Sequence, residues 1–306
     1  MAPAWAQSQI FALAGKSTGD PNFIRAWQGC AEEAQLQGDR CLHLGAPGAA
    51  QARQQDAAIL VALKQPLAGL AVSVTHSALL AEGALKQAAA QRVPVITFDS
   101  DLEPAHRALR LGYVGPDNLA FGRQLGLAAR ASHPRGGLVC ILTDAKDPNL
   151  QQRLWGVRQA LSQQADVPAG ERLQGQGGWT EPARCPWQSG DNTPRAVKQV
   201  SLSLQDMQAD VVISVGHWPV MDAPLFRAAI EPLKAGMAER GQAILVAVGQ
   251  PDEAQLNLLR DGLVQAYASI DFMTMGREAY RQMKRLAQGS AIAPATATPT
   301  VLVQRR

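Results

Sequence analysis

Short apolar runs alternate along almost the whole chain with stretches in which apolar residues recur every three or four positions. The runs predict strands, and the helical spacing predicts helices between them. The predicted strands cover residues 9–14, 41–44, 69–74, 93–98, 111–115, 137–143, 210–216, 243–249 and 263–270, and the predicted helices cover 21–37, 51–64, 78–91, 118–131, 149–164, 193–206, 220–239, 253–261 and 273–288. This alternation predicts an α/β fold with parallel sheets, and the continuous apolar character of the strands indicates that both faces of each sheet are buried.

The number of strands indicates more than one sheet. Together with the extended tail, the predicted strands number about ten or more, which is too many for one comfortable twisted sheet, and 306 residues are enough for about two domains. We therefore expect two sheets, each in its own lobe. Residues 175–193 form the longest irregular segment, which is typical of a functional or mobile loop, and the Pro-rich tail at 290–300 suits a crossing or edge segment. Thr193 and Pro194 predict the N-cap and first turn of the helix that follows.

Polar side chains follow several of the predicted strands. The strand at 93–98 runs directly into Asp99, Ser100 and Asp101, without a Gly or Asn to form a tight turn. Other strands end in the same way, at Lys16, Ser17 and Asp20, at Thr75 and His76, at Thr143 and Asp144, and at His217 and Trp218. Because ligands of open parallel sheets bind beyond the carboxyl ends of the strands, the sequence predicts a ligand-binding edge.

The composition narrows the class of protein. Hydrophobic residues make up 46% and charged residues 18% of the chain, which is enough to form a core. The net charge is +3, with no basic stripe and no run of like charges, so we expect no nucleic-acid partner. No apolar run approaches the ~18 residues that would span a bilayer.

The cysteines and the N-terminus bear on the cellular compartment. The four cysteines, Cys30, Cys41, Cys140 and Cys185, lack the spacing of a zinc site, and Cys140 has the position of a small core residue in a strand. Their even number permits disulfides in an exported protein, but the spacing identifies no pair. Ala4-Trp5-Ala6 has the small-x-small form of a signal-peptidase site without a preceding apolar segment. It is equally compatible with a truncated export signal and with an Ala-rich tail.

Nucleotide-binding motifs are absent from the sequence. The stretch "AGKSTGD" at 14–20 resembles a P-loop, but Ile10 stands where that loop needs its first glycine. No GxGxxG follows a predicted strand. His43 and Trp155 fall within predicted buried elements and are interpreted as packing residues. We therefore expect no cofactor and no metal.

An ordered set of segments carries a family resemblance. The segments are "STGDPNFIRAWQGCAEEAQLQG", "AGLAVSVTHSALLAEGALKQAAAQRVPVITFDSD", "YVGPDNLAFGRQLG", "QQRLWGVRQAL", "ADVVISVGHW", "ILVAVGQPD", "LRDGLVQAYASI" and "MGREAYRQM". Together they resemble, over nearly the whole chain, the periplasmic binding proteins of the ribose- and galactose-binding type, which are the substrate-binding components of sugar ABC importers.

The resemblance implies a fold and a set of partners. It implies a type I periplasmic binding protein with two Rossmann-like lobes, joined by a three-segment hinge and clamping a ligand between them. The lobes would comprise 7–112 plus 271–293 and 114–270 plus 294–306. A small carbohydrate would be delivered to a membrane ABC permease, and the protein is expected to be periplasmic and monomeric.

The resemblance also implies site residues. Asp99 matches the family aspartate that accepts hydrogen bonds from sugar hydroxyls, and Phe23 matches an aromatic residue that stacks on the sugar ring. The other positions carried over, most of which depart from the family's usual residue types, are Lys16, Asp20, Ser100, Gln151, His217 with Trp218, Asp252 and Asp271. A second aromatic wall is expected from Trp218, Trp179 or Trp187. These departures favour a smaller polyol or an unusual or modified sugar over an ordinary aldopyranose.

Some alternatives stay open. Lys16 and His217 are also compatible with surface or lobe-interface positions without ligand contact. A LacI-type repressor shares this architecture but needs an N-terminal helix-turn-helix, and the first strand begins at about residue 9. An enzyme would use Asp99 as general base with His217 as its partner. A binding protein that reports to a membrane receptor has the same sequence features as one that serves an importer. We expect a non-enzymatic binding protein.

Overall fold

The chain folds into two compact units. This computed structural model describes residues 8–145, 147–168, 170–190 and 192–305, so Ala4-Trp5-Ala6 lies outside the described residues. The first unit comprises the chain up to Gly115 together with Asp271–Thr298, and the second comprises Pro116–Ile270 together with Pro299–Arg306.

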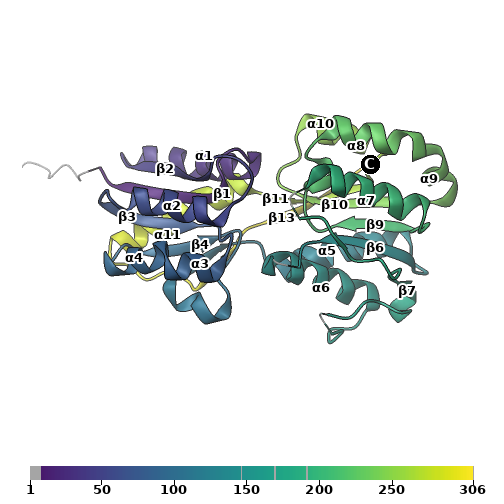
Figure 1. The fold of residues 1–306 in the computed structure, drawn as a ribbon, viewed down its shortest axis with the longest axis horizontal. Helices are drawn as coiled ribbons and strands as arrows, with labels where there is room; N and C mark the ends of the chain where they lie inside the picture. Colours follow the sequence, from purple (N-terminus) through teal and green to yellow (C-terminus); the bar gives the residue numbers. More distant parts are fainter. Residues whose placement is uncertain (1–7, 146, 169, 191, 306) are drawn as a thin grey trace, which may run out of the picture. The chain divides into compact units, whose positions relative to one another are not determined.

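The first unit contains a six-stranded sheet in which all strands run parallel (Figure 1). The strand order is β12-β5-β4-β3-β1-β2, with β1 at Ile10–Ser17, β2 at Arg40–Ala46, β3 at Leu67–Val72, β4 at Val95–Phe98, β5 at Gly112–Gly115 and β12 at Ala295–Ala297. Helices α1 (Pro21–Leu36) and α11 (Phe272–Ala287) pack together on one face, and α2 (Ala52–Ala62), α3 (Ser77–Glu82) and α4 (Ala84–Ala90) pack on the other.

Strand β1 buries both of its faces, which accounts for its continuous apolar sequence. Phe11 packs edge-to-face on Tyr280 of α11, with ring centroids 5.1 Å apart. The next residue, Ala12, points to the opposite face, where it joins a core cluster with Ile59 of α2 and Leu80 of α3. Helices α1 and α11 approach each other very closely where Gly276 of α11 meets Ala26 of α1. A Cβ at Gly276 would lie 1.8 Å from the Ala26 carbonyl oxygen, so this approach requires a residue without a side chain.

The second unit contains a sheet of order β13-β11-β10-β9-β6-β7, in which β8 also pairs with β6 and only β13 runs antiparallel among the described pairings. The strands are β6 at Gly137–Thr143, β7 at Trp179–Thr180, β8 at Trp187–Gln188, β9 at Val211–Ser214, β10 at Ala243–Val248, β11 at Ala266–Ile270 and β13 at Thr300–Gln304. The helices are α5 at Asn118–Ser132, α6 at Pro148–Ser162, α7 at Thr193–Gln205, α8 at Ala223–Ile230, α9 at Lys234–Arg240 and α10 at Glu253–Arg260, and α5 packs against α6 while α7 packs against α8.

The division between the units differs from the sequence-based boundaries at two of the three crossings. The chain crosses at 115/116, 270/271 and 298/299, whereas the sequence placed the outer crossings at 112/114 and 293/294. The difference arises because β5 pairs with β4 up to Val114, and β12 pairs with β5 from Ala295 to Ala297. Both strands therefore belong to the first sheet.

Two predicted helices are broken, each for a local reason. The helix predicted at 78–91 divides at Gly83 into α3 and α4, where the Asp56 carboxylate accepts a hydrogen bond from the Ala84 amide at 2.7 Å. The helix predicted at 220–239 divides into α8 and α9 around Pro232, which lacks an amide hydrogen. The cap of α7 is Asn192 rather than Thr193, since the Asn192 side chain accepts from the Arg195 amide.

The long irregular segment follows the edge of β6 from one end to the other. Trp179 pairs with Gly137 at the start of β6, and Trp187 pairs with Leu142 near its end. Between these pairings, a disulfide joins Cys185 to Cys140 in the middle of β6. The segment predicted to be irregular is therefore attached to the sheet as an interrupted edge strand.

A buried ion pair provides a further attachment for this segment. The Arg158 guanidinium of α6 donates to both oxygens of Glu181, at 2.7 and 2.8 Å. The Leu173 amide donates to the same carboxylate at 3.1 Å. Both side chains are buried, with 2% and 0% of their surface exposed, so neither charge is solvated if the other is removed.

We predict that Glu181→Ala lowers the free energy of unfolding by about 3–5 kcal/mol, because it leaves the Arg158 guanidinium buried without its counter-ion. The matched control is Glu32→Ala, which removes a carboxylate from the exposed pair with Arg277. It should cost at most about 1 kcal/mol. Urea unfolding followed by circular dichroism measures both changes, and equal losses in the two variants would contradict a structural role for the buried pair.

Candidate functional site

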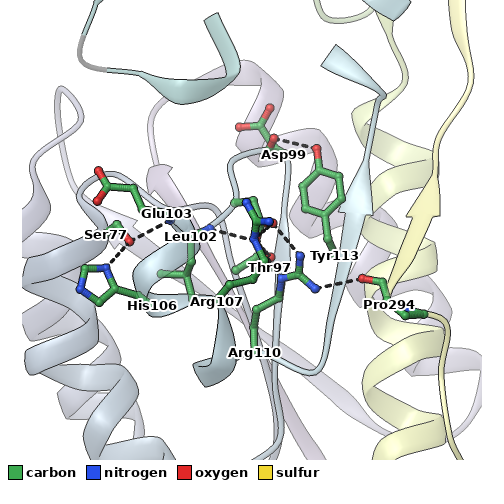
Figure 2. A network of polar contacts seen from close by, with 11 residues as sticks. Ser77, Thr97, Asp99, Leu102, Glu103, His106, Arg107, Arg110, Tyr113 and Pro294 are labelled. Atoms are coloured by element: carbon green, nitrogen blue, oxygen red, sulfur yellow. Dashed lines mark hydrogen bonds and ion pairs between the residues drawn. The ribbon is translucent and has the colours of Figure 1, made fainter. Parts of the chain in front are cut away.

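Asp99 lies at the carboxyl end of β4, in the middle of the first sheet, and is 6% exposed. Ser73, just beyond the end of the neighbouring strand β3, donates its hydroxyl hydrogen to Asp99 Oδ2 at 2.9 Å. The Tyr113 hydroxyl of β5 donates to the Asp99 backbone oxygen at 3.0 Å (Figure 2). Residues from three adjacent strands or their ends therefore meet at this position.

The backbone of Asp99 is strained. Its φ angle is +56°, in the left-handed region that glycine favours, although Asp tolerates that region better than most residues. The Ser100 amide donates to the Phe98 oxygen at 2.5 Å, which closes a three-residue turn with Asp99 at its centre. Such a conformation costs about 1–3 kcal/mol and persists only where the surroundings enforce it, and it is often found at ligand sites.

Asp101 has a different environment from Asp99. The Arg110 guanidinium donates to both Asp101 oxygens, at 2.9 and 2.7 Å, and Thr97 donates to Oδ1 at 2.5 Å. Arg110 also donates to the Pro294 oxygen at 2.9 Å, immediately before β12 (Figure 2). Asp101 is therefore a structural residue that joins the loop after β4 to the last strand of the sheet.

Phe23 lies in the first turn of helix α1, and Asp20 is the N-cap residue of the same helix. Phe23 is 5% exposed, and its ring meets Phe98 and Phe272 edge-to-face at centroid distances of 6.2 and 5.9 Å. The predicted aromatic residue therefore packs on Phe98, the residue directly before the predicted carboxylate of Asp99. Asp20 caps α1 by accepting from the Asn22 amide at 2.8 Å.

Two further predicted residues belong to the first unit. Lys16 is partly buried near the end of β1. Asp271 precedes Phe272 and caps α11, accepting from the Thr274 amide at 2.9 Å and from its hydroxyl at 2.6 Å. Capping occupies part of the acceptor capacity of Asp20 and Asp271, so both carboxylates have a structural role whatever else they bind.

The remaining predicted residues lie at the carboxyl edge of the second sheet. Gln151 of α6 donates to the Asp144 oxygen at 2.8 Å, beyond the end of β6. His217 and Trp218 follow β9, and Trp218 is buried, with its ring so close to Gly216 that a Cβ there would lie 2.8 Å away. Asp252 is exposed and forms a reciprocal capping box with Gln255 at the start of α10.

The aromatic candidates separate by position. Trp179 lies at the amino end of β6 and is 1% exposed, so the suggestion that it forms a ligand wall is wrong. Trp187 lies near the carboxyl end of β6, where its Nε1 donates to the Ser203 hydroxyl at 2.9 Å. Trp187 and Trp218 therefore remain candidates.

Sequence reasoning missed three residues, two that support the carboxyl edge of the first sheet and one that supports that of the second. Ser73 and Tyr113 contact Asp99 across strands, and no local motif marks either of them. Arg153 is buried and donates to Asn118 Oδ1 at 2.7 Å and to the Val215 oxygen at 3.1 Å, which fixes the end of β9 before His217. A helical-periodicity argument could have found Arg153, because it shares the buried face of α6 with Leu150, Leu154 and Val157.

Other features of the described residues are structural. His43 stacks on Trp27 at a centroid distance of 5.0 Å, and burial lowers the pKa of its imidazole. Trp155 donates to the Val167 oxygen at 2.8 Å. The cysteines form two disulfides, Cys30–Cys41 and Cys140–Cys185, which the spacing had left undetermined.

The described part of the chain shows neither a membrane-spanning helix nor a cluster of metal ligands. None of its helices is both long and apolar enough to cross a bilayer. No group of three or more His, Cys, Asp and Glu side chains there is arranged to hold a metal ion. The chemistry of the first sheet's edge is instead that of a carboxylate beside an aromatic cluster. An ionised carboxylate only accepts hydrogen bonds, so this edge suits a ligand with hydroxyl donors.

The chain belongs to the family described as the periplasmic binding protein domain, whose sequence profile it matches over residues 11–291. No curated protein matches it in sequence. The glucose-galactose binding protein GanP from Geobacillus stearothermophilus has a similar fold, with a TM-score of 0.80, 18% identity, and coverage of 97% of this chain and 98% of that one.

Two further solved structures are similar in fold. An ABC transporter solute binding protein from Burkholderia graminis, in complex with D-arabinose, has a TM-score of 0.78 at 19% identity and covers 97% of this chain and 95% of its own. One from Agrobacterium vitis with bound D-fucose has a TM-score of 0.80 at 16% identity, with the same coverage. These likenesses establish the fold expected from the sequence, a type I periplasmic binding protein with two α/β lobes.

We predict that Asp101→Ala lowers the free energy of unfolding by about 2 kcal/mol, because Arg110 is largely buried and loses a two-pronged partner. The control is Asp261→Ala, which removes a carboxylate from an exposed pair with Arg227 and should cost at most about 1 kcal/mol. Urea titration of both variants gives the comparison. A loss for Asp101→Ala no larger than that of the control would remove the structural assignment.

Proposed function

We propose that the chain is an exported solute-binding protein that captures a small carbohydrate and delivers it to a membrane ABC permease. The proposal rests on the position of Asp99. Its carboxylate lies at the centre of the carboxyl edge of the first sheet. The residue before it, Phe98, belongs to the aromatic cluster that contains Phe23. Sugars present hydroxyl donors together with apolar C–H faces, and this pair of groups suits both.

The comparisons support this ligand class. The family is one of binding proteins rather than enzymes, and similar folds have been solved with D-arabinose and D-fucose bound. Gln151, His217, Trp218 and Asp252 would supply the contacts of the second unit, and Lys16, Asp20, Ser100 and Asp271 would contribute from the first. Because many of these residue types depart from the sugar-binding pattern, the ligand we favour is a smaller polyol or an unusual or modified sugar.

Export is supported independently of the ligand. The two disulfides are of the kind that persists in oxidising compartments such as the periplasm. We infer that the protein works there as a monomer.

A thermal-shift screen of sugars, polyols and sugar acids, including D-arabinose, D-fucose, D-allose and D-galactose, tests the ligand class. Absence of any shift across the whole panel would contradict a carbohydrate ligand.

We predict that Asp99→Asn weakens binding of the best ligand from this panel at least about a hundredfold. Two hydrogen bonds to a charged acceptor contribute about 1.5–3 kcal/mol each, and the amide replaces one acceptor with a donor. Asn is the appropriate substitution because it tolerates the left-handed backbone at this position. Isothermal titration calorimetry measures the affinity.

The control for this prediction is Asp101→Asn, two residues further on. It should bind with nearly the wild-type affinity, because the Asp101 carboxylate contacts Arg110 and Thr97. Melting curves of both variants exclude a loss of binding through unfolding. Wild-type affinity in Asp99→Asn, or a larger loss in Asp101→Asn, would refute the assignment of Asp99 as the ligand acceptor.

A further inference from the structure

Two side chains with no assigned role hold Asp99 in place. Ser73 contacts its carboxylate and Tyr113 contacts its backbone, through the hydrogen bonds of 2.9 and 3.0 Å described above. We propose that Ser73 and Tyr113 are positioning residues of the ligand site, which set the direction of the Asp99 carboxylate without being required to touch the ligand. The inference rests on the proposed function and names residues that neither the family nor the similar folds identify.

The backbone at Asp99 needs external support. A left-handed φ angle at a residue other than glycine is unfavourable in isolation. Strand β5 binds both the amide and the carbonyl group of Asp99. The Asp99 amide donates to the Val114 oxygen at 3.0 Å, and the Asp99 oxygen accepts from the Tyr113 hydroxyl (Figure 2). Tyr113 therefore supplies one of the two contacts from β5 that keep the peptide unit in this orientation.

The Tyr113 hydroxyl occupies the space that a side chain at Gly115 would fill. A Cβ at Gly115 would lie 2.2 Å from that hydroxyl oxygen and 3.2 Å from the Asp99 amide nitrogen. The absence of a side chain at Gly115 thus allows the Tyr113 hydroxyl to lie beside the Asp99 turn.

Ser73 is itself rigidly held. Its side chain is completely buried, and its amide donates to the Ala14 oxygen at 2.9 Å. The backbone oxygen of Ser73 accepts a hydrogen bond from the buried side-chain amide of Gln55, at 2.7 Å from Nε2. A hydroxyl has a single hydrogen to donate, and here it is directed to Asp99 Oδ2, which restricts the rotation of that carboxylate.

A purely structural role predicts a different result from a positioning role. If Ser73 and Tyr113 act through Asp99, their removal should weaken ligand binding only while the Asp99 side chain is present. The test measures affinity by calorimetry for Ser73→Ala and Tyr113→Phe, alone and combined with Asp99→Gly. Glycine suits the left-handed backbone and removes the carboxylate together with the need for support. The probe is the member of the panel of sugars, polyols and sugar acids, which includes D-arabinose, D-fucose, D-allose and D-galactose, that binds the wild type most tightly.

Each single substitution should weaken binding about tenfold, and neither should weaken it further in the Asp99→Gly background. Two controls remove buried hydrogen bonds elsewhere. Tyr280→Phe removes a tyrosine–aspartate bond to Asp39 in the first unit, and Ser162→Ala removes a buried serine hydroxyl in the second. Both should lower the melting temperature without changing affinity. Equal losses of affinity with and without the Asp99 side chain would overturn the proposal.

A ligand-free measurement separates failure of this inference from failure of the proposed function. Crystal structures of unliganded Ser73→Ala and Tyr113→Phe should show the Asp99 carboxylate or its peptide unit displaced, while Tyr280→Phe should leave both unchanged. An unmoved Asp99 in the two site variants would refute positioning whatever the ligand is. A displaced Asp99 in a protein that binds no member of the panel of sugars, polyols and sugar acids would refute the carbohydrate ligand and leave the positioning inference supported.

Discussion

Parallel pairing of β1, β3 and β4 is the constraint on which the candidate site depends. The register aligns Ala14 with Val72 and Val72 with Thr97, so Ser73 and Asp99 both emerge just beyond the ends of their strands. Beyond Phe98 the pairing shifts by two residues, because the Leu70 amide donates to the Pro94 oxygen whereas the Val74 amide donates to the Ser100 oxygen, both at 3.0 Å. The turn at Asp99 takes up these two residues and brings its carboxylate to the Ser73 hydroxyl. A different register of β3 against β4 would separate these two side chains.

One buried amide stabilises the same edge from the helix side. Gln55 of α2 is completely buried, and its Nε2 donates to the Gly15 and Ser73 oxygens at 2.9 and 2.7 Å. Its oxygen accepts from the Thr75 hydroxyl at 2.5 Å. The end of β1 and the residues after β3 are thereby fixed by a single side chain whose donor and acceptor are both satisfied. The polar residues at this edge therefore divide into those that support it and those, such as Asp99, that are placed by the support.

The second unit stabilises its long segment by covalent and ionic contacts instead. Within its described residues, the segment from 175 to 193 contributes two short strands, so backbone pairing alone attaches it weakly. The Cys140–Cys185 disulfide and the Arg158–Glu181 pair connect it to β6 and α6. A disulfide restricts the unfolded chain, and a buried pair is destabilising once broken, so both contacts favour one arrangement of the segment. Trp187 lies two residues after Cys185, so the same contacts hold it in position.

The sequence by itself determined the class of fold, the order of the elements and the strand ends at which polar residues gather. These follow from local periodicity and from the rule that parallel strands align their carboxyl ends. Asp99 and Phe23 were proposed through family resemblance, and the structure packs Phe23 on Phe98, the residue before Asp99. Only the tertiary structure decided what distinguishes Asp99 from Asp101, because Arg110, Ser73 and Tyr113 reach these carboxylates from other segments. Only the tertiary structure paired the cysteines, and only it placed β12 in the first sheet, since both depend on contacts between distant parts of the chain.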